Sequence, residues 1–519
     1  AEGKTVTPAA EWLIDNYHLV EEQIRQTRAD LPPGFYRQLP KLAEGPLVGH
    51  PRIFGLVWAH VAHTDSHFDP ALLTDFVNEY QQVQPLEIGE LWAVAISLRL
   101  ILIENLRRIS QRIMAARRGR DAADKLAHAR RRFSLPEGVN YLDGNSLGAL
   151  PKGVAERVGA TIADEWGQGL IRSWNAAGWY DSPGRIGRKL APLLGASPDC
   201  VTVTDTISIN LYKLLVTAVR MRPDRKVIVA ERGNFPSDNH MVDSVARMLD
   251  MTVRYVPPGE VAAAVDEQTA VAELSHVNYR TAEIQNMRRV SAAIHATGAL
   301  VIWDLAHSSG AVELNLDADG ADFAVGCGYK FLNGGPGAPS HVYVAASHLQ
   351  AIDQPLTGWF AHVAPFAFEH EFKRADGIRA MLCSTPQMLS NAAFEAALDA
   401  FGGIAMADVQ AKGRALGDLM IRLYDERLAK LGCGLTTTRD GARRGNHVSL
   451  THDSAYQIVQ ALIAEGIIGD FRAPDVMRFG FGPLYVRFVD VFESVAAIER
   501  IITAGSWKYI PLPHADAVT

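Results

Sequence analysis

A carboxylate and an amine follow two consecutive apolar segments in the middle of the chain. Asp304 ends the segment Val301–Asp304, and Lys330 comes directly after the segment Phe323–Tyr329. A lysine amine can form a Schiff base with an aldehyde, and a carboxylate can keep a pyridine nitrogen protonated so that the ring accepts electrons. Either residue alone would be weak evidence, because lysines after strands are commonly surface residues and aspartates there are commonly helix caps. Together they predict catalytic residues that work with pyridoxal 5′-phosphate (PLP).

Two loops upstream could complete a PLP site. Residues 204–210 lie where an apolar segment ends and a helix is expected to begin. Backbone N–H groups and the Ser208 hydroxyl could hold a phosphate there, although an ordinary Ser/Thr cap is the other interpretation. Residues 234–238 follow another apolar segment, and Phe235 could stack on a pyridine ring while Asp238 hydrogen-bonds to it.

These residues need a scaffold that brings the ends of several segments together. Short apolar segments are expected as strands at 201–204, 226–230, 252–256, 270–274, 299–304 and 322–326, with helices between them, for example at 239–249 and 288–297. Continuous apolar strands that alternate with helices predict an α/β fold with a mostly parallel sheet covered on both faces. Ligands of such sheets bind at the carboxyl ends of the strands, which is where the polar residues above occur.

The remaining sequence suggests further domains. Residues 1–115 are expected to be helical, because Trp12, Leu13, Tyr17, Val20 and Ile24 follow the spacing of an amphipathic helix and a long helix opens near residue 89. A charged stretch at 116–125 is expected as a linker. We therefore predict an N-terminal helical segment (1–115), a linker (116–125), a large PLP-binding domain (126–390) and a small C-terminal α+β domain (391–519), the last with helices at 392–401 and 408–431.

Composition restricts the class of protein. The 519 residues carry 51 basic and 58 acidic side chains, a net charge of −7, with 48% hydrophobic and 21% charged residues. These values fit a globular enzyme and argue against a nucleic-acid partner. Four cysteines without metal-ligand spacing favour a reducing cytoplasm, and His50, His60, His63 and His67 form no known metal motif, so no metal is expected. The longest apolar stretch (91–106) contains two charges, so no membrane span is expected.

Several longer motifs resemble kynureninase. They are Tyr141–Gly148, Phe235–Asp238, Asp304–His307, Tyr329–Gly335, Gly358–Phe360, Gly469–Asp475 and Arg478–Tyr485, within a resemblance that covers about residues 121–510. The resemblance implies a homodimeric PLP enzyme of the aspartate-aminotransferase fold, with an active site shared between subunits. It implies hydrolysis of L-kynurenine, or its 3-hydroxy form, to anthranilate, or 3-hydroxyanthranilate, and L-alanine, in tryptophan catabolism and NAD biosynthesis.

The same resemblance implies roles for individual residues. Lys330 is the Schiff-base lysine, Asp304 meets the pyridine nitrogen, and Tyr329 is the nearest candidate for a general acid or base. The further cofactor contacts that it implies are Ile207, Ser208, Phe235, Pro236, Ser237, Asp238, Ser275, His307 and Tyr329, with Trp359 and Thr385 supplied by the partner subunit. Arg478 is expected to clamp the substrate carboxylate bidentately, and Trp174 to face the aryl ring. Some family members carry Asn in place of Thr385 and His in place of Trp174.

Residues 1–115 do not match that family. The motifs at 31–41, 54–59 and 89–99 resemble a helical stretch of cyclic β-1,2-glucan synthases outside their catalytic core, so no glycosyltransferase site is inferred and a fused gene is expected. Two other functions stay open. A cysteine desulfurase of the same fold would need a nucleophilic thiol, for which Cys383 is the candidate near the site. A scaffold with a vestigial PLP domain is the alternative outside enzymes.

Overall fold

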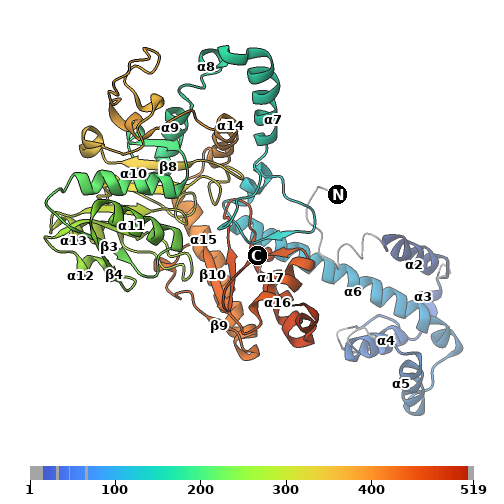
Figure 1. Cartoon of the computed structure of the whole chain (residues 1–519). Helices are drawn as coiled ribbons and strands as arrows, with labels where there is room; N and C mark the ends of the chain where they lie inside the picture. Colours follow the sequence, from blue (N-terminus) through green and yellow to red (C-terminus); the bar gives the residue numbers. More distant parts are fainter. Residues whose placement is uncertain (1–15, 31–33, 46, 65–67, 512–519) are drawn as a thin grey trace. The chain divides into compact units, whose positions relative to one another are not determined.

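The computed structural model describes residues 16–30, 34–45, 47–64 and 68–511, which belong to two compact units divided between Ala123 and Asp124 (Figure 1). Trp12, Leu13, residues 31–33 and His67, which entered the sequence-based expectations, lie outside the described residues.

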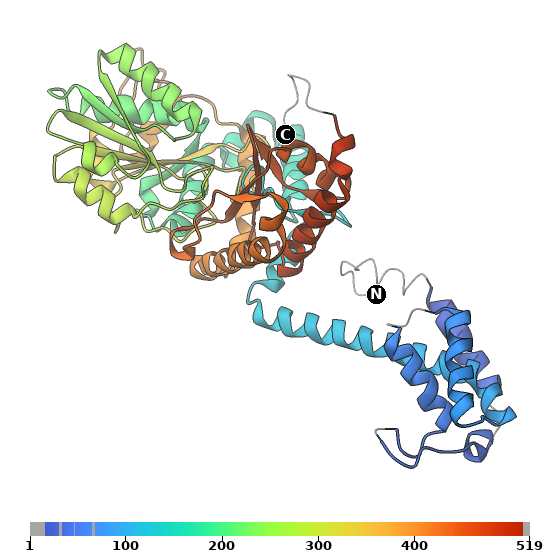
Figure 2. The same ribbon diagram turned by 90° about the horizontal axis from the view of Figure 1, so that it is seen from below.

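The N-terminal unit contains the helices α2 (Tyr17–Asp30), α3 (Phe35–Gln38), α4 (Arg52–His63), α5 (Pro70–Val83) and α6 (Ile88–Ala123) (Figure 2). Ile53, Val57 and Val61 recur every four residues on α4, so they share one face of the helix, and they are buried in the core of this unit. Arg52 at the start of α4 donates to the fully buried Glu90, with an Nη2–Oε2 distance of 2.5 Å. A helical core is therefore built within this unit alone.

The stretch 116–125, expected as a linker, is helical as far as Ala123, where α6 ends. Alanine and arginine dominate it, and both are strong helix formers, so a high density of charge does not interrupt the helix there. Within the part of the chain that the structure describes, no helix combines the length and the apolar character that crossing a membrane requires.

The second unit is built on a seven-stranded sheet in the order β2-β8-β7-β6-β5-β3-β4. Its strands are β2 (Val201–Thr204), β3 (Val227–Glu231), β4 (Thr252–Val256), β5 (Thr269–Ser275), β6 (Leu300–Asp304), β7 (Phe323–Cys327) and β8 (Ser340–Val344). β3 to β7 run parallel, while β8 is antiparallel to both β2 and β7, so all strands except β8 point the same way. The expected mostly parallel α/β sheet is confirmed.

Helices cover both faces of this sheet because successive side chains of each strand point to opposite faces. On β6, Ile302 lies in the core with α10 (Ile207–Arg220) and α11 (Pro236–Leu249), whereas Val301 and Trp303 lie in the core of the other face. That second core includes residues of α9 (Ser182–Leu194), α13 (Met287–His295) and α14 (Met388–Ala397). Because both faces of the sheet are buried, the strands are apolar at successive positions and do not alternate between apolar and polar residues.

The C-terminal region forms a smaller antiparallel sheet in the order β12-β13-β10-β9. Its elements are β9 (Gly434–Leu435), β10 (His447–Thr451), β12 (Asp470–Arg472), β13 (Val476–Gly480) and the helices α15 (Met406–Leu423), α16 (Ala455–Ala464) and α17 (Phe488–Ala504). Residues 140–143, which we assigned to the large domain, pair with residues of this C-terminal region, in part through a separate two-stranded sheet. β1 (Asn140–Tyr141) runs parallel to β11 (Ile467–Ile468), and Asp143 bridges to Gly480. These partners are more than 300 residues apart in the chain, so no local sequence pattern predicts their pairing.

Candidate active site

Four neighbouring strands bring the candidate residues to one edge of the large sheet. Ser275, at the end of β5, is the register partner of Asp304, at the end of β6, and Asp304 is in turn the partner of Val325 on β7. Lys330 follows β7, and Asp238 lies in the first turn of α11, which follows β3. Parallel strands place their carboxyl ends together, so residues separated by almost a hundred positions meet here.

The Lys330 side chain points into this edge. Its Nζ lies 3.1 Å from His307 Nε2, and 5.9 Å and 6.0 Å from the ring centroids of Phe235 and Tyr329. Gly148 N donates to the Tyr329 carbonyl at 2.7 Å, and a side chain at Gly148 would collide with the Lys330 carbonyl. Only glycine allows this close approach, so the segment 141–148 helps to hold the lysine loop in place.

Asp304 and Asp238 form a buried pair of carboxyls. Asp304 accepts from Ala306 N at 2.8 Å, and its Oδ2 lies 3.3 Å from the Ser275 hydroxyl, whose single hydrogen is directed mainly to Asn234 Oδ1. Burial, together with the neighbouring carboxyl, raises the pKa of Asp238 well above its ordinary value, and burial also raises the pKa of Asp304 although Lys330 opposes this. One Asp238 oxygen is buried without a hydrogen-bond partner among the described residues, so this oxygen of the pair lacks a neighbouring donor.

His307 is an uncharged hydrogen-bond acceptor for the Lys330 amine. Burial, and then the positive charge of Lys330, holds the pKa of His307 well below its usual value. A neutral imidazole whose Nε2 accepts from Lys330 carries its proton on Nδ1, and His307 Nδ1 is buried without a partner in the described structure. His307 thus orients the amine without competing for positive charge.

The segment after β2 has the geometry of an anion site. Asp205 has a φ of +45°, Thr206 caps α10 by accepting from Ile209 N at 3.5 Å, and Ile207 and Ser208 are the first residues of that helix. N–H groups in the first turn of a helix have no acceptor within the helix, so those of Ile207 and Ser208 can bind a phosphate. Sequence reasoning missed Lys213, which is buried on α10 next to this segment and donates to Asp205 Oδ2 and, at 2.8 Å, to the Met381 carbonyl.

These residues fit PLP. The carboxyls of Asp304 and Asp238 lie in the interior beside Lys330, and a protonated pyridine nitrogen at Asp304 would supply this pair with a second positive charge, while the unpaired Asp238 oxygen would face the polar edge of the same ring. Phe235 is 39% exposed at the same edge, so its ring is free to stack on a planar ligand. Among the described residues, no group of three or more His, Cys, Asp or Glu side chains is arranged to hold a metal ion.

Arg478 on β13 is held more tightly than the sequence suggests. Its Nε and Nη2 donate to the two oxygens of Asp470 at 2.9 and 2.5 Å, Nη2 also donates to Ser146 Oγ at 3.2 Å, and Nη1 donates to the Tyr279 carbonyl at 2.8 Å. An arginine has five N–H donors, so a single hydrogen on Nη1 is left. The expected bidentate clamp on a carboxylate would therefore require Ser146 or Tyr279 to release its contact.

Trp174, Trp359 and Thr385 do not contact the Lys330 and Asp304 side chains of the same chain in the described interactions. Trp174 contacts Trp359 and Phe360, with ring centroids 5.8 and 6.2 Å apart, and Thr385 is exposed. Among the described interactions, no hydrogen bond, ion pair or ring contact joins these three residues to Lys330 or Asp304 of the same chain. Pro236 and Ser237, by contrast, open α11 directly beside Phe235.

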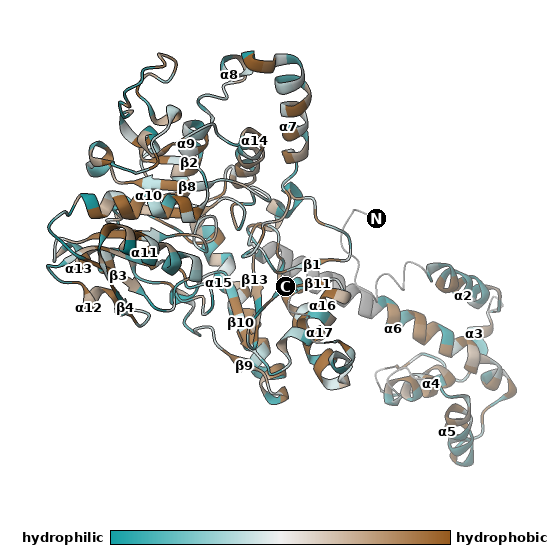
Figure 3. Cartoon of the chain, in the orientation of Figure 1, coloured by the Kyte–Doolittle hydropathy of each residue, from teal (hydrophilic) through white to brown (hydrophobic). Residues whose placement is uncertain are grey.

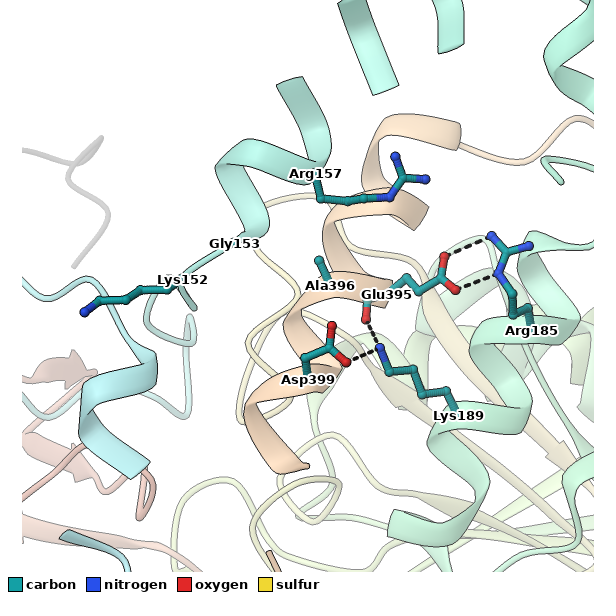
Figure 4. A pocket seen from close by; sticks show the side chains of 8 residues that line it. All are labelled: Lys152, Gly153, Arg157, Arg185, Lys189, Glu395, Ala396 and Asp399. Atoms are coloured by element: carbon teal, nitrogen blue, oxygen red, sulfur yellow. Dashed lines mark hydrogen bonds and ion pairs between the residues drawn. The ribbon is translucent and has the colours of Figure 1, made fainter. Parts of the chain in front are cut away.

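A separate open cleft of about 420 Å³ lies between α7 (Val154–Ala160), α9 and α14 (Figure 4). Its charged side chains are mostly paired: Arg185 with Glu395 at 2.6 Å and Lys189 with Asp399 at 2.7 Å. Its lining contains none of the residues described above. The first ion pair joins α9 to α14 and the second joins α9 to the short 3-10 helix Leu398–Phe401 that follows α14, so the charged residues of the cleft have a structural role.

Comparisons with known proteins agree with this geometry. Residues 409–498 match the family model described as kynureninase C-terminal domain. The kynureninase of Pseudomonas fluorescens is 48% identical over 406 residues, which cover 77% of this chain and 98% of that protein. The kynureninase of Burkholderia mallei strain SAVP1 is 46% identical with the same coverage.

Solved structures support the fold. A cysteine desulfurase from Thermococcus onnurineus superimposes with a TM-score of 0.63 at 17% identity, over 73% of this chain and 98% of that one. A C-DES mutant with glycine covalently linked to its PLP cofactor superimposes with a TM-score of 0.62 at 18% identity, over 70% of this chain and 96% of that one. The second unit thus has the fold of PLP-dependent enzymes.

Proposed function

Because the chain belongs to the kynureninase family, we propose that its active site binds PLP and hydrolyses L-kynurenine to anthranilate and L-alanine, with the 3-hydroxy form as a second substrate. The observation that carries the proposal is the meeting of Lys330, Asp304 and Asp238 at the carboxyl ends of adjacent strands. PLP supplies an aldehyde that a lysine amine can hold covalently and a protonated ring that accepts electron density from the substrate.

The amine of Lys330 has two tasks. It would hold the cofactor aldehyde covalently, and as a free amine it would accept the proton from the substrate α-carbon. His307 orients Nζ at 3.1 Å for both tasks. Burial raises the pKa of Tyr329, so its phenol stays protonated and acts as an acid that returns a proton.

Asp304 would keep the pyridine nitrogen of bound PLP protonated. Its carboxyl is buried, so it gains from a positive partner, and Ser275 Oγ and Ala306 N hold its two oxygens in place. Asp238 would hold the polar edge of the ring, Phe235 would stack on its face, and the first turn of α10 at Ile207 and Ser208 would bind the phosphate.

The overall reaction consumes one water. Hydroxide from water adds to the carbonyl carbon beside the aryl ring, the bond from that carbon to the β-carbon breaks, and the β-carbon gains a proton. Arg478 binds the α-carboxylate through the free hydrogen on Nη1 and through the Nη2 hydrogen that Ser146 Oγ holds at 3.2 Å, because that neutral contact is the weaker one to exchange for a carboxylate.

The active site is shared in a homodimer. Support comes from an apolar surface near Trp174: Ile162, Trp166, Leu170 and Ile171 are between 44% and 77% exposed. α7 and α8 (Ser173–Ala176) bound this segment, which carries hydrophobic residues (Figure 3). Docking on a second copy would cover this surface and deliver Trp359 and Thr385 to the cofactor phosphate and Trp174 to the aryl ring of the partner's site.

The remaining roles concern the cell and the N-terminal unit. We place the enzyme in the cytoplasm, where its four free cysteines would stay reduced, in tryptophan catabolism that leads to NAD. The N-terminal unit, with its resemblance to a helical stretch of cyclic β-1,2-glucan synthases, is assigned no catalytic role and marks a fusion.

Anthranilate fluorescence tests the function. PLP-loaded protein mixed with L-kynurenine is expected to release anthranilate and L-alanine in equal amounts, and Lys330→Ala is the matched control without turnover. Release of sulfide from cysteine in place of anthranilate would favour the desulfurase alternative. Burial raises the pKa of the Cys383 thiol, which disfavours the thiolate that such chemistry needs. Failure of the protein to bind PLP would favour the scaffold.

A further inference from the structure

Asn234 stands at the centre of the cofactor site but touches no reacting group. Its side-chain oxygen accepts from Phe235 N at 2.8 Å and from Ser275 Oγ. A backbone N–H can only donate, so the amide orientation is determined: Oδ1 faces Phe235 and Nδ2 faces the opposite way. Asn234 therefore links the aromatic ring of Phe235 with the Ser275 hydroxyl that lies 3.3 Å from Asp304 Oδ2.

The Nδ2 group of Asn234 is held by Glu273. This residue lies in the middle of β5, is completely buried, and receives hydrogen bonds from Nδ2 at 2.9 Å on each of its carboxyl oxygens. A carboxyl group among the apolar residues in the middle of a fully buried strand (Thr269–Ser275) is costly to bury unless it is hydrogen-bonded. Within the described hydrogen bonds, Asn234 is the side chain that satisfies it.

We propose that Glu273 is a positioning residue for PLP, acting through Asn234 on both Phe235 and the Ser275–Asp304 pair. One buried carboxyl thereby sets the position of the group that stacks on the cofactor face and of the group that pairs with its ring nitrogen. The inference rests on the PLP site of the proposed function but not on the identity of the substrate.

The proposal follows from the direction of each bond. Without an acceptor at position 273, Asn234 Nδ2 would be a buried donor without a partner, which is more costly than an exposed one. The amide could regain a partner only by rotating, which would turn Oδ1 away from Phe235 N and Ser275 Oγ. Both cofactor contacts would then loosen together.

The test uses the full chain, stripped of PLP and titrated with PLP, with tryptophan fluorescence for Kd and visible circular dichroism for the orientation of the bound ring. Glu273→Leu is expected to raise the Kd about tenfold, the effect of orphaning one buried donor, and to reduce the dichroism at saturating PLP. Asn234→Ala is expected to do the same. In the double variant the Kd is expected to stay within about twofold of Asn234→Ala alone, since both changes break one pathway.

Glu231→Gln is the matched control. Glu231 is also buried, ends the adjacent strand β3, and accepts from Gln285 at 3.0 Å without bonding the Asn234 side chain. Its Kd and dichroism are expected to match the wild type. A wild-type Kd and dichroism for Glu273→Leu would overturn the proposal, and so would a double variant in which the two effects multiply.

Glu273→Gln covers the case in which the leucine variant does not fold. The amide oxygen of the new glutamine keeps one of the two hydrogen bonds to Asn234, so the Kd for PLP is expected to rise about threefold. In the Asn234→Ala background the same change is expected to leave the Kd unaltered. A wild-type Kd for Glu273→Gln alone would overturn the proposal. A wild type that binds PLP but releases no anthranilate would contradict the proposed function while leaving this test intact.

Discussion

Replacing Asp470 by asparagine tests how the substrate-binding arginine is held. Arg478 is 2% exposed, and both Asp470 oxygens accept from it at 2.9 and 2.5 Å. The Arg478 and Arg472 side chains lower the pKa of Asp470 in spite of the burial that works to raise it, so the carboxylate is charged at neutral pH. Asp470→Asn removes that charge and turns one acceptor into a donor.

The magnitude follows from burial. Removing one partner of a buried ion pair costs about 3–5 kcal/mol, because the other charge stays in the interior uncompensated. We expect the lower end, about 3 kcal/mol, since Ser146 and the Tyr279 carbonyl still bind Arg478. Displacement of the guanidinium accounts for most of this free-energy loss. We therefore expect kcat/KM for L-kynurenine to fall about 100-fold, mainly through a higher KM.

Urea denaturation and anthranilate fluorescence measure the two effects. Asp425→Asn is the control, because Asp425 pairs with Arg439 in the same bidentate way, at 2.7 and 2.8 Å, but on the surface. Surface pairs contribute little, so this variant should match the wild type in both assays. Wild-type stability and KM for Asp470→Asn would refute the argument that Asp470 holds Arg478 for the substrate.

Four further predictions follow from the site and the units. Lys330→Ala should lose the visible absorbance of lysine-bound PLP together with turnover; retention of both would remove its assignment. Mixing Lys330→Ala with Trp359→Ala protein should recover about a quarter of wild-type activity, because only hybrid dimers contain an intact site; no recovery would contradict the shared site. Burial raises the pKa of Glu273 to about 8, so stability should decline between about pH 4.5 and 8 as the unfolded chain releases its proton first. Glu273→Gln should flatten that decline in urea titrations at several pH values, and an unchanged slope would contradict it. Deleting residues 1–123 should leave kcat/KM within about twofold, because the core clusters of the second unit contain only its own residues; a large loss would give the helical unit a role in catalysis.

Local patterns explain why the strands and the central site residues could be predicted. The segment before Asp304 is apolar throughout, and both faces of its strand proved to be buried. Asp304 and Lys330 could be paired because parallel strands align their ends whatever the connecting helices contain. Glu273 offered a signal that was missed, since a charged residue within an apolar strand needs a buried partner.

The amino-acid sequence by itself determined the alternation of apolar strands and helices, the residue types at the strand ends and hence the PLP chemistry, because these depend on spacing along the chain. Only the tertiary structure decided that β8 lies between β2 and β7, that β1 joins β11, that Asp470 takes two of the five N–H donors of Arg478, and that Glu273 meets Asn234. Each of these depends on groups that are distant in the chain and become neighbours only when the burial of both sheet faces selects one packing.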